Sequence, residues 1–281
     1  MTIKTIAEMR AACAEARRSG KRLGFVPTMG ALHEGHLSLV RAARARCDAV
    51  AVSIFVNPTQ FGPTEDFSKY PRSFERDREL LEAEGVDLLF APSVEEMYPK
   101  GAVTFVTVEG LSEKLCGRSR PGHFRGVTTV VAKLFNIVQP GVAFFGQKDA
   151  AQVVIAKKMV RDLDLPVEIA VCPIVREADG LAMSSRNAYL DAAERRSATV
   201  LHRVLMQVQA LAEKGERRAA TLIEAAQTVF REEPSVRVDY VEIVDAETLD
   251  PAAEVSRGAL VAVAAFVGAT RLIDNIVLPA R

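Results

Sequence analysis

The sequence predicts an α/β fold in which a doubly wound, mainly parallel β-sheet is followed by a smaller α+β domain. Up to about residue 175, short apolar runs typical of strands alternate with amphipathic helical stretches, as in βαβ units. After Arg176, helical stretches come first and strand-like runs then follow one another closely, as in a hairpin or meander. We therefore expect two domains, at residues 1–176 and 177–281.

The first domain is expected to alternate strands with connecting helices. Apolar runs place the strands at Arg22–Val26, Ala49–Val56, Asp87–Phe90, Val142–Phe145 and Val167–Val175. Helical periodicity places the helices at His36–Cys47, Ser73–Glu84, Phe124–Ile137 and Ala150–Leu163. The apolar stripe of the first of these helices comprises Leu39, Val40, Ala43 and Cys47. Because ligands of such sheets bind beyond the carboxyl ends of the strands, the strand-to-helix loops should carry the chemistry.

The second domain begins with helical patterns, from Asp191 to about Lys214 and from Arg218 to Arg231. The strand-like runs are Val236–Val244, Ala259–Val267 and Arg271–Leu278. No helical pattern separates these runs, which favours antiparallel pairing.

Composition argues against several classes of protein. The chain has 281 residues, of which 49% are hydrophobic and 26% charged, as in ordinary globular proteins. Lys plus Arg equals Asp plus Glu at 36 each, whereas nucleic-acid-binding proteins normally carry a basic excess. The four cysteines have no zinc or redox spacing, and no apolar run approaches the ~20 residues of a membrane span. No signal-peptide core is visible, so we expect a cytoplasmic protein without nucleic-acid or membrane partners.

The segment Pro27–His36 predicts an anion site. It lies between a predicted strand and a predicted helix, and its glycines allow a tight turn and close approach of a ligand. The free N–H groups at the helix start attract phosphate. His33 and His36 are three residues apart, so both imidazoles face the same way and can donate to phosphate oxygens or take up a positive charge.

Two alternatives compete for this segment. The zinc-protease motif H-E-x-x-H places its second histidine at i+4, whereas His36 follows His33 at i+3. A surface turn that holds two histidines by chance is the other alternative. The order of strand, glycine turn and helix favours the anion site over both.

The segment Met183–Arg186 predicts a second phosphate-binding loop. The hydroxyls of Ser184 and Ser185 can bind phosphate oxygens, and Arg186 adds a permanent charge with a planar fork of donors. The alternative is a helix N-cap, since serines commonly begin helices.

Two further loops follow predicted strands. In Phe144–Gln152, Lys148 is a mobile cation for a phosphate, Asp149 suits a ribose hydroxyl or a helix cap, and Gln152 faces the same pocket one turn later. In Phe55–Gly62, the amides of Asn57 and Gln60 can orient a substrate with hydroxyls and a carboxylate. A simple polar turn is the alternative there, because of Pro58 and Gly62.

These motifs resemble those of a known family. His33-Glu34-Gly35-His36 resembles the HIGH motif and Met183–Arg186 the KMSKS loop of the nucleotidyltransferase superfamily, which implies a Rossmann-like sheet. Together with Arg120–Val127 and the two other loops, they resemble the pantothenate synthetase family over nearly the whole chain. The resemblance implies ATP-dependent ligation of pantoate and β-alanine through a pantoyl-adenylate, with release of AMP and diphosphate. It also implies Mg²⁺ as a cofactor and a homodimer.

The resemblance further implies roles for individual residues. The catalytic residues would be His33, His36, Lys148 and Arg186. The ATP site would comprise Met29, Gly30, Ala31, Leu32, His33, Glu34, Gly35, His36, Gly146, Gln147, Lys148, Asp149, Val175, Met183, Ser184, Ser185 and Arg186. Gln60 and Gln152 would hold pantoate, with Gln60 also near β-alanine, and Asp77 would contact magnesium.

Two other functions compete with this one. A nucleotidyltransferase of the same superfamily could act on a different small acceptor, although a phosphate acceptor would favour more basic residues than Asn57, Gln60 and Gln152. A nucleotide- or RNA-binding module without activity is the other, and the balanced charge argues against RNA.

Overall fold

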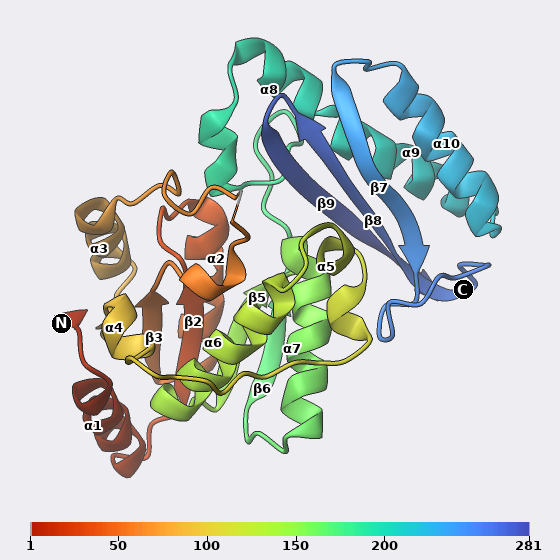
Figure 1. Cartoon of the computed structure of the whole chain (residues 1–281). Coiled ribbons are helices and arrows are strands. Elements are labelled where there is room, and N and C mark those ends of the chain that lie inside the picture. Colours follow the sequence, from red (N-terminus) through yellow and green to blue (C-terminus); the bar gives the residue numbers. More distant parts are fainter. Residues whose placement is uncertain (1, 64, 281) are drawn as a thin grey trace.

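The computed structural model describes residues 2–63 and 65–280 as two β-sheets with flanking helices (Figure 1). The strands are β1 (Thr2–Ile3), β2 (Leu23–Thr28), β3 (Ala49–Ile54), β4 (Leu88–Phe90), β5 (Val142–Gly146), β6 (Glu168–Cys172), β7 (Val236–Val244), β8 (Arg257–Val267) and β9 (Thr270–Ala280). The α-helices are α1 (Ile6–Arg18), α2 (Glu34–Arg46), α3 (Phe74–Ala83), α4 (Val94–Met97), α5 (Cys116–Ser119), α6 (His123–Val138), α7 (Ala150–Asp162), α8 (Ala192–Ala198), α9 (Val200–Glu213) and α10 (Ala219–Arg231). Short 3-10 helices are η1 (Pro58–Gln60), η2 (Leu111–Glu113), η3 (Gln147–Asp149) and η4 (Ser185–Tyr189).

The larger sheet is parallel, with strand order β1-β4-β3-β2-β5-β6. The chain winds outward from β2 through β3 to β4, and then returns to form β5 on the other side of β2. The winding direction therefore reverses between β2 and β5, where doubly wound sheets bind their ligands. The predicted doubly wound sheet is confirmed, and its five predicted strands correspond to β2–β6.

The burial of α2 confirms its predicted apolar stripe. Leu39, Val40 and Ala43 pack in the core between the helix and the sheet, while Arg41 forms ion pairs at the surface. Cys47 ends the helix as its C-cap rather than extending it. The apolar face of α2 thus fixes the helix against the sheet, and its first turn lies at the carboxyl edge of β2.

The smaller sheet is antiparallel, in the order β7-β8-β9, as predicted. The residues of β8 alternate between two cores: Val261 and Val263 pack with α9 and α10, whereas Leu260 and Ala262 pack in the core of the larger sheet. The helical pattern expected from Asp191 to about Lys214 is divided, because Thr199 ends α8 with hydrogen bonds to Arg196. The domain boundary after residue 176 stays a prediction.

None of the helices within the described ranges has the length and apolar character needed to cross a membrane.

Candidate active site

Hydrogen bonds to α3 fix the loop between β2 and α2. Gly30 and Ala31 both have positive φ, 81° and 51°, so the chain turns sharply. The N–H groups of Ala31 and Leu32 donate to the carboxylate of Asp77, at 2.7 and 2.9 Å. Thr28 Oγ accepts the N–H of Gly30 at 3.2 Å. These contacts fix the loop backbone at the end of β2.

The two histidines begin α2 as a reciprocal cap. His33 Nδ1 accepts the N–H of Gly35 at 3.2 Å, and His36 Nδ1 accepts the N–H of His33 at 3.3 Å. A side chain at position 35 would meet the His33 ring at 2.9 Å, so the cap requires Gly35. Because Nδ1 accepts in both rings, each neutral imidazole carries its proton on Nε2. Both histidines are thus fixed as Nε2–H donors.

Burial keeps these imidazoles neutral. Desolvation, together with the charge of Lys148, lowers the pKa of His33 to about 4. Burial and the neighbouring His33 lower the pKa of His36 to about 3. The ring centroids are 4.1 Å apart. Near neutral pH the pair therefore provides hydrogen-bond donors rather than positive charge. The zinc-site alternative is not favoured, since the described residues contain no cluster of three or more metal-ligating His, Cys, Asp or Glu side chains.

The second predicted loop contacts the first directly. Ser185 Oγ donates to the carbonyl of Ala31 at 3.1 Å, although 154 positions separate the two residues. Ser184 Oγ accepts the N–H of Arg186 at 3.3 Å and begins η4. The N-cap alternative is therefore correct for the Ser184 side chain. The two motifs nevertheless meet, which is the arrangement that a shared triphosphate site requires.

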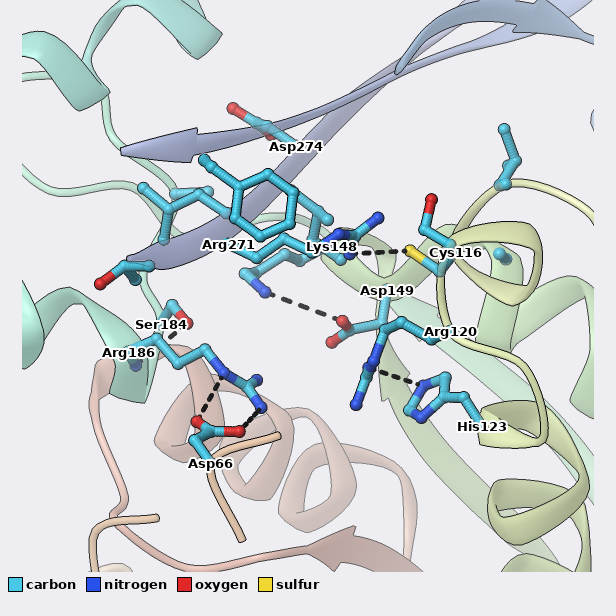
Figure 2. Close-up of a pocket in the computed structure, with 18 of the residues that line it drawn as sticks. Asp66, Cys116, Arg120, His123, Lys148, Asp149, Ser184, Arg186, Arg271 and Asp274 are labelled. Carbon is cyan, nitrogen blue, oxygen red and sulfur yellow. Dashed lines mark hydrogen bonds and ion pairs between the residues drawn. The ribbon is translucent and has the colours of Figure 1, made fainter. Parts of the chain in front are cut away.

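Arg186 is bound to an acidic loop. Its guanidinium forms a bidentate ion pair with Asp66, at 3.0 and 2.9 Å (Figure 2). It also lies over the ring of Tyr70. The next carboxylate in the loop, Glu65, binds Arg120 at 2.8 and 2.5 Å. Adjacent carboxylates thus neutralise the guanidiniums of Arg120 and Arg186 in this structure.

The loop after β5 brings a lysine and a carboxylate to the same place. Lys148 Nζ lies 3.7 Å from Asp149 Oδ1, and both side chains line the cleft (Figure 2). Asp149 precedes α7 but makes no side-chain cap, so the cap alternative does not describe its carboxylate. Gln147 turns away and binds Asn275 of β9 at 2.9 Å. This contact ties the larger sheet to the smaller one.

The Asn57–Gln60 turn is held by buried hydrogen bonds. Asn57 Nδ2 donates to Gln60 Oε1 at 3.0 Å and to the carbonyl of Gly126 at 3.1 Å. A Cβ at Gly126 would lie 2.3 Å from the Thr59 carbonyl, so α6 approaches this turn closely only with glycine there. Asn57 also caps η1 through the N–H of Thr59, as the polar-turn alternative expects. Asn57 thus positions the Gln60 amide.

Two adjoining cavities, of about 230 and 700 Å³, form the cleft between these loops. Most of the predicted site residues line the smaller one: Met29, His33, Gly35, His36, Gln60, Gly146, Lys148, Asp149, Gln152, Val175, Met183, Ser184, Ser185 and Arg186. Five residues with predicted binding or catalytic roles line both cavities: Lys148, Asp149, Gln152, Ser184 and Arg186. The structure thus brings these distant segments together at one cleft, while the role of each residue stays a prediction.

Other predicted residues lie outside the cavities. The side chain of Leu32 is buried in the core, and Glu34 pairs with Arg41 on the outer face of α2. Gly30 and Ala31 contribute backbone to the loop. Asp77 lies beneath it, with both carboxylate oxygens accepting backbone amides, so the carboxylate does not fit as a magnesium contact.

Residues without a predicted role also line the cleft. His123 Nδ1 donates to the carbonyl of Gln60 at 2.8 Å, and Arg120 donates to His123 Nε2 at 3.1 Å. Burial lowers the pKa of His123 to about 4, so this ring is also neutral near pH 7. Both belong to the Arg120–Val127 segment. The signal in the sequence that could indicate these two residues is the cluster of basic residues around Pro121 and Gly122.

Comparisons with known proteins agree with this geometry. A family model described as pantoate-beta-alanine ligase matches residues 1–277. Pantothenate synthetase from Koribacter versatilis is 62% identical over 278 residues, covering 99% of this chain and 96% of that protein. The enzyme from Moorella thermoacetica is 60% identical over 276 residues, covering 98% of each chain.

Solved structures are similar over the same length. Pantothenate synthetase from Thermus thermophilus has a TM-score of 0.94 at 51% identity, covering 98% of both chains. Pantoate-beta-alanine ligase from Francisella tularensis, crystallised with beta-gamma ATP and beta-alanine, has a TM-score of 0.81 at 32% identity. That match covers 98% of this chain and 97% of the other.

Proposed function

This chain belongs to the pantoate-beta-alanine ligase family, and from that membership we propose how its own residues carry out the reaction. The protein is an ATP-dependent acid–amine ligase that joins pantoate to β-alanine. The competing functions, another nucleotidyltransferase and an inactive binding module, are not favoured. The family and the Francisella tularensis complex with ATP and beta-alanine support ATP as the co-substrate.

In the first step, a pantoate carboxylate oxygen attacks the α-phosphorus of ATP. A bond forms between that oxygen and phosphorus, the bond to the bridging oxygen breaks, and diphosphate leaves with the bonding electrons. Negative charge grows on the phosphate oxygens. We assign its stabilisation to the Nε2–H groups of His33 and His36 and to the Lys148 cation, which line one cavity.

Arg186 is proposed to join this set by exchanging partners. Its guanidinium is paired with Asp66, and the same planar fork of donors can bind two phosphate oxygens. ATP binding would then release Asp66 from Arg186. The loop Met183–Arg186 opens the second predicted domain, so its approach would also exclude water from the adenylate.

In the second step, the neutral amine of β-alanine attacks the acyl carbon of the adenylate. The carbon–nitrogen bond forms, AMP departs with the electrons of the acyl–oxygen bond, and the nitrogen loses a proton. We place pantoate between Gln60 and Gln152, whose amides can bind its hydroxyls and carboxylate. Gln60 is held by Asn57 and is only 9% exposed, which supports a fixed orientation.

Three finer assignments are also part of the proposal. Mg²⁺ would arrive with the phosphates of ATP, since Asp77 does not fit it, and no step is assigned to the ion. A homodimer follows from the family resemblance and is tested by sedimentation. A cytoplasmic location would suit the four free cysteines, because reducing compartments keep thiols in this state.

The contact between Ser185 and Ala31 carries the proposal, because it brings both phosphate-binding motifs to one cleft. The test uses ATP and pantoate without β-alanine, and measures diphosphate release by rapid quench. We expect about one equivalent of diphosphate per site, followed by AMP only when β-alanine is added. Diphosphate release that requires β-alanine would contradict the adenylate sequence.

A further inference from the structure

One buried carboxylate beside the cleft lies outside the proposed chemistry. Asp77 is in the first turn of α3, is 1% exposed, and lines neither cavity of the cleft. Burying an ionised carboxylate is costly unless donors replace the lost water. The contacts that compensate this charge therefore indicate what the residue does.

Within the described ranges, the hydrogen bonds to this carboxylate come from a loop backbone or from its own helix start. Ala31 N–H donates to Oδ2 at 2.7 Å, and Leu32 N–H donates to Oδ1 at 2.9 Å. Ser73 Oγ donates to Oδ1 at 3.2 Å. From the same turn of α3, Arg76 donates to the carbonyl of Leu32 at 3.2 Å. Side chains in the first turn of α3 thus bind the main chain of the β2–α2 loop.

Ala31 is the residue at which this support meets the second motif. Its N–H is bound by Asp77, and its carbonyl accepts the hydroxyl of Ser185. Ala31 also has a positive φ of 51°, which is unfavourable for a residue with a Cβ. A charged acceptor on its N–H compensates that conformation. The position of this one residue therefore decides where Ser185 docks and where the cap at His33 begins.

The same contacts are incompatible with magnesium at Asp77. Mg²⁺ requires oxygen ligands at about 2.0–2.1 Å in near-octahedral geometry, most of them usually water. Both Asp77 oxygens already accept amide protons, and the side chain is sealed from solvent. An ion could bind only after the loop had left its place.

We propose that Asp77 is a positioning residue for adenylate formation: it holds the Ala31 peptide so that the β2–α2 loop and the Met183–Arg186 loop meet in register. This inference rests on the proposed function. It assigns the carboxylate to the loop backbone and removes it from the magnesium site that the family resemblance implied.

The experiment compares the full-length wild type with Asp77→Asn. The amide keeps the shape and one acceptor oxygen, but places an N–H group against a backbone N–H. The diphosphate burst with ATP and pantoate should slow by about 10²-fold, as for a misplaced reacting group. The Mg²⁺ concentration that gives half the maximal burst rate should stay within about twofold of the wild-type value. Glu75→Gln, on the exposed side of the same helix turn, is the matched control and should retain the wild-type rate.

Three outcomes would overturn the proposal. If high Mg²⁺ restores the burst rate of Asp77→Asn, and the Mg²⁺ concentration for half the maximal burst rate is raised, then Asp77 is a magnesium ligand. A lower melting temperature with an unchanged burst rate would make it only a structural residue. The third outcome concerns the double variant of Asp77→Asn and Ser185→Ala. If its burst rate is reduced by the product of the two single reductions, the two side chains do not act on one peptide. We expect a reduction smaller than that product.

Two further measurements keep the test decisive. If Asp77→Asn does not fold, Ser73→Ala removes one donor to the carboxylate and should slow the burst several-fold with an unchanged Mg²⁺ midpoint; a wild-type rate would count against the proposal. The wild-type burst itself tests the proposed function. A normal burst with no effect of Asp77→Asn refutes this inference alone.

Discussion

Replacing Lys148 by alanine should separate the two chemical steps. The Lys148 side chain is 21% exposed and Lys148 lines both cavities of the cleft, with its ammonium 3.7 Å from the Asp149 carboxylate. A unit charge about 4 Å from a phosphate oxygen contributes about 4 kcal/mol at an effective dielectric constant of about 20. The neighbouring carboxylate offsets part of this effect. We therefore expect adenylate formation to slow by about 10²–10³-fold.

The second step should respond much less to the same substitution. Diphosphate has left by then, and the charge that develops is that of the departing AMP. We expect Lys148→Ala to slow the attack of β-alanine on preformed pantoyl-adenylate by less than about 10-fold. Lys158→Ala is the matched control, because Lys158 lies on the same α7 but pairs with Asp162 at the surface.

The assay measures diphosphate formation by rapid quench and, separately, pantothenate formation from added adenylate. Equal slowing of both steps would refute the reasoning, because it would place the cation at a group present throughout the reaction. An unchanged first step would remove Lys148 from the phosphate site.

His36→Ala removes one fixed Nε2–H donor and should lower the single-turnover rate of diphosphate formation by about 10²-fold; a near-wild-type rate in a folded variant would exclude the role. Asp66→Asn frees Arg186 from a competing carboxylate and should tighten ATP binding roughly fivefold in calorimetry, corresponding to an ion pair of about 1 kcal/mol, whereas weaker binding would contradict the exchange of partners. Acid should destabilise the fold, because the pKa values of His33, His36 and His123 are lowered to about 4, 3 and 4, while unfolded histidines titrate near 6.5. The unfolded chain then binds more protons than the folded one, so the free energy of unfolding should fall as the pH decreases from about 6.5 toward 4. Equal free energies of unfolding at pH 7 and pH 5, measured with urea, would argue against neutral buried rings.

The sequence predicted those elements that have strong apolar periodicity. The strands β2 and β3 are nearly continuous buried runs, and α2 carries a clear apolar stripe, so the sequence pattern predicts each of them to within a few residues. The edge strand β1 is only two residues long, too short for any pattern. The helix α1 has only Met9 and Cys13 fully buried, so its apolar face is too sparse for the sequence pattern to predict a helix there.

The candidate site shows the same limit at the level of side chains. Three of the segments that meet in the cleft could be predicted because they follow β2, β3 and β5 of one parallel sheet. The ion pair between Arg186 and Asp66 joins loops 120 positions apart, and no spacing rule indicates it. For Asp77, the family resemblance implied a magnesium contact, but only the fold shows that its carboxylate accepts the N–H groups of Ala31 and Leu32.

The alternation along β8 has a consequence for how the molecule is built. Leu260 and Ala262 complete the core of the larger sheet. The carboxyl-terminal third of the chain therefore covers part of that core in addition to forming its own. Either part of the chain, produced as an isolated fragment, would expose to water the apolar surface that the other part covers. Melting should therefore be concerted, and an exchange of this portion between relatives would succeed only where the donor carries side chains of matching volume at those positions.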